Sequence, residues 1–167
     1  MILGYIFTLL NYVCFCLSRF ARQKVTILTL DLVSKIFTIL GLYCLNSLSG
    51  AYLFFAVFCV LIVVNIKERI HKNWLWGYLF FQSLYIVILY ATYIGISSIL
   101  VGLSVSVSLF CNWWLPPQKI RLIGGINGLV FLTYQISIKN WAGLLEIFAL
   151  LSNFCSFIKY RKKYSKR

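Results

Sequence analysis

The stretch Asn112–Leu122 reads NWWLPPQKIRL and lies between two long apolar runs of the chain. It contains both prolines of the protein, Pro116 and Pro117, directly after two tryptophans and a leucine. A proline disfavours the helical conformation of the residue before it, so Pro116 restricts Leu115 and Pro117 restricts Pro116. The stretch therefore predicts a rigid end to one helix and the start of the next. A hinge at Pro116 and Pro117 is the alternative interpretation.

The apolar runs on either side of this break reflect the whole chain, which is 62% hydrophobic and only 11% charged. Soluble domains average about 45–50% apolar and about 25% charged residues, so we expect lipid to surround this protein. A helix needs about 20 apolar residues to cross a bilayer, and the runs lack the alternation of barrel strands. The sequence predicts an all-α polytopic membrane protein with seven transmembrane helices, at 2–18, 25–45, 50–66, 74–93, 96–115, 120–138 and 141–158.

The basic residues predict how these helices are oriented. Fourteen of the 16 Lys and Arg residues follow the first, third, fifth and seventh runs, and Lys139 alone lies in the loops on the other side. The positive-inside rule then predicts a bacterial cytoplasmic (inner) membrane protein with its N-terminus outside and its C-terminus cytoplasmic. Because topology explains the net charge of +13, we expect no nucleic-acid partner. The tryptophans lie at run ends, which is typical of interface anchors: Trp74, Trp76, Trp113, Trp114 and Trp141.

Two halves of the chain are weakly similar. Gln23-Lys24 aligns with Gln118-Lys119, and Phe55-Ala56 aligns with Phe148-Ala149. Each half predicts three helices that start outside and end inside, so the repeats are parallel and related by an axis along the membrane normal. The predicted arrangement is 3+1+3, with a first three-helix bundle at 1–72, a linker helix at 73–95, a second bundle at 96–158 and a basic cytoplasmic tail at 159–167.

This plan and the Pro117-Gln118 step resemble the PQ-loop superfamily, which includes the sugar transporters called SWEETs. Over nearly its full length, the chain more closely resembles bacterial inner-membrane proteins of the YgjV type. Four segments carry that resemblance: RFARQKVTIL at 19–28, SGAYLFFAV at 49–57, NWWLPPQKIRLIGGINGL at 112–129 and KNWAGLLEIFALLSN at 139–153. The resemblance implies the seven-helix architecture. The first half departs from the PQ-loop pattern, because it has Arg22-Gln23 where the second half has Pro117-Gln118.

Ionisable residues inside the runs are candidate site residues, because each costs about 2.5–3.5 kcal/mol at the centre of a membrane helix. Asp31 and Lys35 are spaced i,i+4, which places them on one helix face within reach of each other. We expect them to neutralise each other as a structural pair, or to line a polar cavity. Glu146 lies one turn into the seventh run. Either it exchanges a proton or contacts a polar solute, or it lies near the membrane interface and reaches water or Lys139.

Three asparagines complete the predicted substrate-binding set. Asn127 lies among Gly124, Gly125 and Gly128, and small residues let helices approach so that an asparagine can bond across the bundle. With Asn153 it is predicted to line any central pathway, and Asn11 is a polar group of the first half. The full set is Asn11, Asp31, Lys35, Asn127, Glu146 and Asn153. The nearby serines at 104, 106 and 108 are expected to bond to carbonyls of their own helix.

The remaining motifs exclude other classes of function. One histidine, His71, permits neither a Ser-His-Asp arrangement nor a metal-ligand set, and there is no phosphate-binding glycine loop. We therefore expect no enzyme, metal or cofactor. The predicted function is transport or facilitation of a small polar solute along an axial pathway, with the lipid bilayer, that solute and a homo-oligomer as partners. The alternative is a non-transporting interaction or regulatory subunit. Convergence of Asn11, Asn127, Glu146 and Asn153 on one cavity would favour transport.

Overall fold

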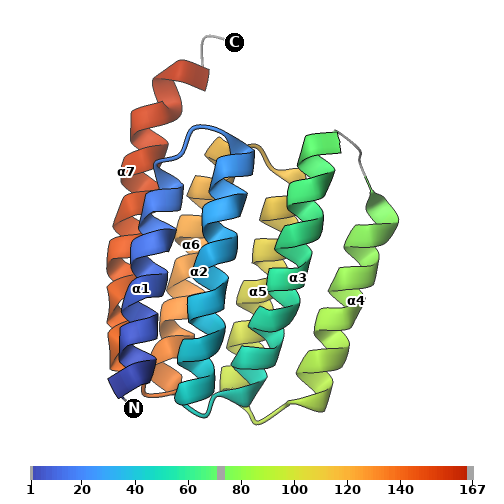
Figure 1. Cartoon of the computed structure of the whole chain (residues 1–167), viewed down its shortest axis with the longest axis vertical. Coiled ribbons are helices and arrows are strands. Elements are labelled where there is room, and N and C mark those ends of the chain that lie inside the picture. The colour runs from blue at the N-terminus through green and yellow to red at the C-terminus, as the bar shows by residue number, and fades with distance from the viewer. Residues whose placement is uncertain (1, 71–73, 165–167) are drawn as a thin grey trace.

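The computed structural model describes residues 2–70 and 74–164, so His71 and Lys72 and the end of the basic tail lie outside it. Across these two ranges the chain forms helices and no strand (Figure 1), which confirms the predicted all-α class. The elements are α1 (Ile2–Arg19), α2 (Lys24–Cys44), α3 (Leu48–Ile70), α4 (Leu75–Ala91), α5 (Ile96–Trp114), α6 (Pro117–Ser137), the short 3-10 helix η1 (Trp141–Leu145) and α7 (Glu146–Tyr164).

Successive helices run up and down the bundle, with the N-terminal end at the bottom and the C-terminal end at the top of Figure 1. Helix α1 packs on α2, α2 on α3, α3 on α5, α5 on α6, α6 on α7 and α7 on α1, so that six helices close a ring. Helix α4 packs outside this ring, against α3 and α5. The ring therefore encloses a centre that all six helices face.

The break between α5 and α6 has the predicted form of a rigid helix end. Leu115 is extended, with φ −92° and ψ 148°, and Pro116 follows with φ −71° and ψ 160°. Pro117 is the first residue of α6, where a proline suits a helix because its missing N–H has no partner to lose. The connection from α5 to α6 is thus two residues long, which forces the two helices to be antiparallel neighbours.

The same break leaves a carbonyl that another helix must satisfy. The carbonyl of Trp113 would accept a bond from the N–H of residue 117 in a continuous helix, but a proline has none. Lys67 of α3 supplies the missing donor, because its Nζ donates a hydrogen bond to the Trp113 carbonyl at 2.6 Å. The same Nζ lies 5.5 Å from the ring centroids of Trp113 and Trp114. Lys67, expected to serve only as a topology signal in a loop, therefore fastens the end of α5 to α3.

Five helices are long and apolar enough to cross a membrane: α1, α2, α5, the segment Gly50–Ile70 of α3 and the segment Trp141–Arg161 of η1 and α7. Helix α4 is apolar but has only 17 residues. Helix α6 has 21 residues but carries polar side chains toward the ring centre. The chain is thus compatible with a multi-pass membrane protein, and spanning by α4 and α6 remains a prediction.

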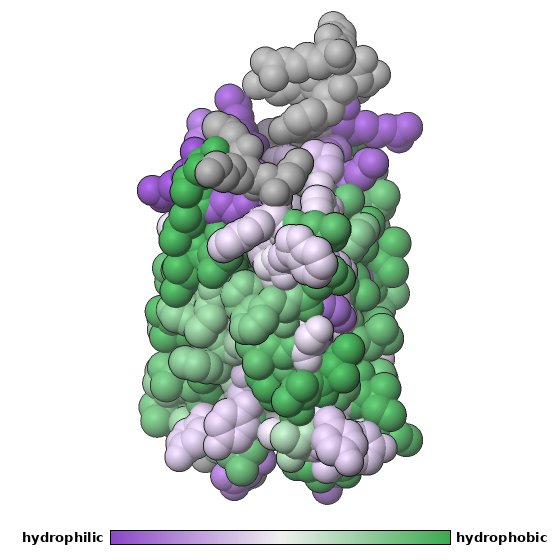
Figure 2. Space-filling model, turned by 90° about the vertical axis from the view of Figure 1, so that its right-hand side faces the viewer, coloured by the Kyte–Doolittle hydropathy of each residue, from purple (hydrophilic) through white to green (hydrophobic). Residues whose placement is uncertain are grey.

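The outer surface agrees with lipid surroundings. Figure 2 shows a hydrophobic band around the middle of one face, with hydrophilic residues gathered at the top end and paler ones at the bottom. Trp74, Trp76 and Trp141 are exposed at helix ends, as interface anchors should be. The expectation for Trp113 is wrong, because its side chain is 0% exposed and its ring contacts Tyr78 and Phe81 of α4.

The paired positions of the two halves share their surroundings. Phe55 and Phe148 are both exposed, and Ala56 and Ala149 are both buried. The grouping into two separate bundles remains a prediction, because the ring also closes through contacts of α3 with α5 and of α7 with α1. What the fold establishes is a single central space to which both halves contribute.

Candidate functional site: a central polar cavity

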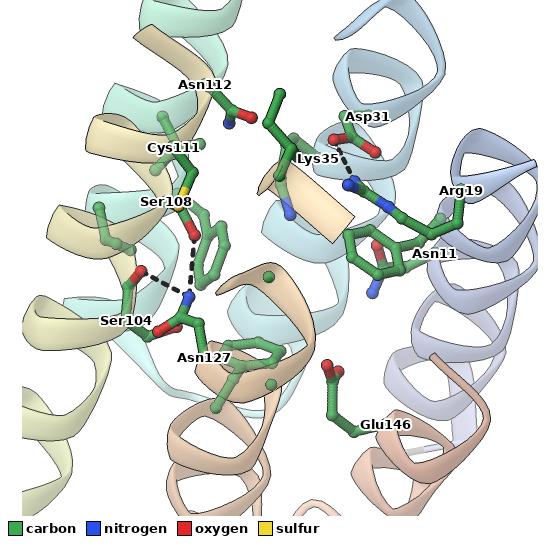
Figure 3. Close-up of a pocket in the computed structure, with 18 of the residues that line it drawn as sticks. Asn11, Arg19, Asp31, Lys35, Ser104, Ser108, Cys111, Asn112, Asn127 and Glu146 are labelled. Carbon is green, nitrogen blue, oxygen red and sulfur yellow. Dashed lines mark hydrogen bonds and ion pairs between the residues drawn. The ribbon is translucent and has the colours of Figure 1, made fainter. Parts of the chain in front are cut away.

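A cavity of about 80 Å³ lies inside the ring, and all six ring helices line it. One water molecule needs roughly 10–15 Å³ of such space, so the cavity has room for about five waters or one small solute. It extends from Asn112 near the end of α5 to Glu146 at the start of α7. Figure 3 shows side chains from both halves of the chain pointing into this space. Helix α4 contributes nothing to its lining.

Five of the six predicted site residues line the cavity: Asn11, Asp31, Lys35, Asn127 and Glu146. Asn153 is buried but lies outside it, with its Nδ2 bonded to the carbonyl of Ala149 in its own helix at 3.0 Å. The Asn153 side chain instead faces the glycine surface of α6, where a Cβ on Gly124 would lie 3.8 Å from its Oδ1. Asn153 therefore lies in the α6–α7 contact, and its role at a pathway stays a prediction.

Asp31 forms an ion pair with Arg19 and not with Lys35, which corrects the expected Asp31–Lys35 pair. The carboxylate of Asp31 accepts from the Arg19 guanidinium and, at 2.6 Å, from the Ser18 hydroxyl. The Arg19 guanidinium also lies 4.1 Å from the ring centroid of Phe15. Arg19 was expected in a cytoplasmic loop, but it is the last residue of α1 and its side chain is only 3% exposed. The buried carboxylate of Asp31 stabilises the buried guanidinium of Arg19 by neutralising its charge.

Lys35 extends into the cavity without an ion-pair partner among the residues at 2–70 and 74–164. Its Nζ lies 5.6 Å from the ring centroid of Phe15 and 5.1 Å from that of Phe54. Aromatic faces attract a cation through their quadrupole, by about 0.5–2 kcal/mol depending on exposure. The two rings therefore hold the ammonium group at the cavity without neutralising its charge.

Asn127 joins α6 to α5, as its place among glycines predicted. Its Nδ2 donates to the Ser104 carbonyl at 2.9 Å, to the Ser104 hydroxyl at 3.2 Å and to the Ser108 hydroxyl at 3.1 Å. The hydroxyls of Ser104 and Ser108 thus accept bonds from another helix, and their expected donation to carbonyls of α5 stays a prediction. The Oδ1 of Asn127 is buried and finds no hydrogen-bond partner in the described part of the chain.

Glu146 is the first residue of α7 and only 5% exposed. No Lys or Arg of the described ranges forms an ion pair with it, and Lys139 is exposed elsewhere. The hydroxyl of Tyr12 lies beside its carboxyl group. Gly128 of α6 leaves room for it, because a Cβ there would lie 2.9 Å from its Oε1. Glu146 thus belongs to the cavity and not to the membrane interface.

Asn11 is fixed at the cavity by a neighbour in α2. Its Oδ1 accepts a bond from the Thr38 hydroxyl at 2.9 Å, and Thr38 also bonds to the Ser34 carbonyl in its own helix. This arrangement orients the amide, so that its Nδ2 is the group left to face the cavity.

Arg121 closes the basic end of the cavity. Its Nε donates to the Arg19 carbonyl at 3.0 Å, and its Nη2 donates to the Ala21 carbonyl at 2.6 Å. Its guanidinium lies 4.6 Å from the ring centroid of Tyr160, whose hydroxyl bonds to the Phe20 carbonyl. Arg121 was expected to be a loop charge, but it is 0% exposed and ties α6 to the end of α1.

A second set of hydrogen bonds closes the opposite end. The Tyr134 hydroxyl and the Ser47 hydroxyl lie 2.7 Å apart, which joins α6 to the segment before α3. Asn140 donates to the Gln135 side chain at 2.8 Å. Gly143 must be glycine for this packing, because a Cβ there would lie 2.3 Å from the Gln135 Cβ. The Tyr134–Ser47 contact joins segments far apart in the chain, whereas the Asn140–Gln135 bond is local to the end of α6.

The cavity does not have the ligands of a metal site. Across the described residues, no group of three or more His, Cys, Asp or Glu side chains could hold a metal ion. Its polar groups suit hydrogen bonding and charge pairing with a small organic solute.

No family model, no curated protein and no solved structure matches this chain.

Sequence reasoning did not find several residues that line or close the cavity, chiefly Arg19, Ser104, Ser108 and Arg121. The two arginines were assigned to loops because a charge next to an apolar run usually reaches water. The signal for the serines was their i,i+4 spacing, which places both hydroxyls on one face of α5 toward a single neighbour.

Proposed function

We propose that this protein is a transporter or facilitator of a small polar solute in the bacterial cytoplasmic membrane. The observation that carries the proposal is the central cavity, which gathers Asn11, Lys35, Asn127 and Glu146 from four helices into one space. Polar groups inside an apolar bundle cost free energy, and in membrane proteins they mark solute and ion pathways. Asn11 and Asn127 also bond to neighbouring helices, but they border the same space as Lys35 and Glu146.

The ends of the cavity support the same proposal. Hydrogen bonds close both ends, through Arg121 at the basic end and through Tyr134 and Asn140 at the other. A solute could pass if one set opened while the other stayed closed, as in alternating access around a central site. The predicted 3+1+3 arrangement and the resemblance to YgjV-type and PQ-loop proteins fit such a movement of one half against the other.

The test is uptake by vesicles that contain the purified protein. We expect the protein to equilibrate small polar solutes across the vesicle membrane, measured by light scattering as the vesicles swell. Glu146→Gln should reduce the rate at least about tenfold, because it removes a charge from the cavity wall. Glu68→Gln is the matched control, since Glu68 pairs with Lys24 outside the cavity.

Two results would contradict the proposal. One is the absence of solute movement by the unaltered protein for sugars, polyols, amino acids and organic ions alike. The other is full activity of Glu146→Gln, which would leave transport without this cavity. A retained melting profile in each variant ensures that the comparison is made on folded protein.

A further inference from the structure

The four charged side chains that line the cavity are not equally neutralised. Arg19 and Asp31 form an ion pair with each other. Lys35 and Glu146 carry opposite charges but lie beyond ion-pair distance from each other and from every other described charge. Figure 3 shows them entering the cavity from different sides, Lys35 from α2 and Glu146 from α7. The cavity therefore presents one cation and one anion, each with its polar end toward the same space.

From this arrangement we propose that the cavity binds a small zwitterionic solute, with its anionic group at Lys35 and its cationic group at Glu146. The inference rests on the proposed transport function and names the class of its substrate. A buried ion needs an opposite charge close by, because desolvation strongly disfavours it otherwise. A monoanion would leave Glu146 without a partner, a monocation would leave Lys35 without one, and a sugar or polyol would leave both.

The placement of the two unpaired charged groups agrees with this direction of binding. Asn127 and Glu146 lie on the same lower side of the cavity in Figure 3, and Lys35 lies above them. The Glu146 carboxyl group is thus at one end of the cavity and the Lys35 ammonium group is at the other.

The volume and the apolar lining of the cavity indicate the size of the solute and the chemistry of its central part. Phe54, Val57 and Phe131 contribute apolar side chains to the lining, which suits a short aliphatic segment. The volume of about 80 Å³ suits a solute with few heavy atoms. A short amino acid such as glycine or β-alanine has this pattern of a carboxylate and an ammonium group on a small aliphatic frame.

The test uses the purified full-length protein in nanodiscs and measures its melting temperature in the presence of added solutes. The probes are glycine and β-alanine, with acetate, ethylammonium and glycerol as analogues that lack one or both charges. A ligand that binds the folded state raises the melting temperature according to its concentration relative to Kd. We expect the zwitterions to raise it at concentrations at least tenfold below those that any analogue requires. Equal effects of all five compounds, or of none, would overturn the inference.

Two variants test the assignment of each end. Lys35→Gln should shift binding from glycine toward ethylammonium, because it removes the cation that repels the amine. Glu146→Gln should shift binding toward acetate for the opposite reason. A structural role would weaken every ligand alike and would not produce opposite shifts. The matched controls are Lys119→Gln, an exposed residue, and Glu68→Gln, which lies outside the cavity.

The outcome can be separated from that of the transport proposal. Uptake of glycerol or a sugar by vesicles, with no zwitterion binding, would retain transport and overturn the substrate class. Selective zwitterion binding without any uptake would retain the site and contradict transport.

Discussion

At the scale of single residues, the side chain at position 31 decides which cation of the cavity stays free. Asp31 accepts bonds from both Ser18 and Arg19, which uses its carboxylate oxygens on the α1 side. Lys35, one turn further along α2, is left with only the faces of Phe15 and Phe54. The i,i+4 spacing of Asp31 and Lys35 placed both on the correct face, but a spacing rule cannot choose between two competing cations.

Glycine at position 128 determines where Glu146 can lie, and this gives a prediction at the same scale. A Cβ at Gly128 would lie 2.7 Å from Leu150 Cδ2 and 2.9 Å from Glu146 Oε1, so both side chains must move. We expect Gly128→Ala to lower uptake or ligand affinity at least about tenfold, because the carboxyl group leaves its position (1.4 kcal/mol corresponds to about tenfold). The measurement is solute-dependent melting or vesicle uptake.

Gly124→Ala is the control for that change. Gly124 lies one helix turn earlier on α6 and also lines the cavity, but a Cβ there would meet nothing closer than Asn153 Oδ1 at 3.8 Å. Both variants gain the same helix preference of alanine over glycine, about 0.5–1 kcal/mol. Equal uptake by the two variants would show that the position of Glu146 does not depend on Gly128.

At the scale of helices, the break between α5 and α6 combines a proline pair with a bond from a third helix. Pro117 has no N–H for the Trp113 carbonyl, and Lys67 of α3 supplies the donor. The break is thus tied to α3 and to α4, whose Tyr78 packs on Trp113 and Trp114. These contacts favour a rigid end over a hinge.

The rigid end predicts the behaviour of a variant with both prolines replaced. Pro116→Ala combined with Pro117→Ala should lower the free energy of unfolding by about 1–2 kcal/mol, because each proline restricts the unfolded chain. The transport rate per folded molecule should stay unchanged, as measured in vesicles. A changed rate at unchanged stability would instead identify Pro116 and Pro117 as a hinge.

At the scale of the whole molecule, the sequence predicted the helices well and the interior less well. Most predicted runs and observed helices agree within a few residues, because the breaks are marked by prolines, glycines and basic clusters such as RFARQK. The last helix was predicted to end at 158, but α7 continues to Tyr164 and takes in part of the predicted tail. Which residues lie in the interior depends on which helix faces contact each other, and this is harder to predict from the sequence. Asn127 was found because its glycine neighbours imply a close approach, whereas Arg19 and Arg121 were missed because composition cannot show that a loop-side arginine turns inward.

The distribution of charge between the two ends predicts the orientation of the molecule. Arg19 and Arg121 are buried, yet they lie at the same end as the exposed Arg22, Lys119, Lys159 and Arg161. The opposite end has Lys139 as its one basic residue in the loops between runs. The positive-inside rule then predicts that the C-terminal end of α7 lies in the cytoplasm and the N-terminal end of α1 outside.

A pair of C-terminal fusions in a bacterial host tests this orientation. We expect a green fluorescent protein fused after Arg167 to be fluorescent and an alkaline phosphatase at the same position to be inactive, because the first matures in the cytoplasm and the second needs the oxidising periplasm. Replacing Lys159 and Arg161 with glutamine should leave this result unchanged, since the basic residues after α1, α3 and α5 remain and the bias is summed over several loops. An active phosphatase fusion together with a non-fluorescent green fluorescent protein fusion would contradict this orientation. The basic end of the bundle, which Arg121 closes, would then face the outside.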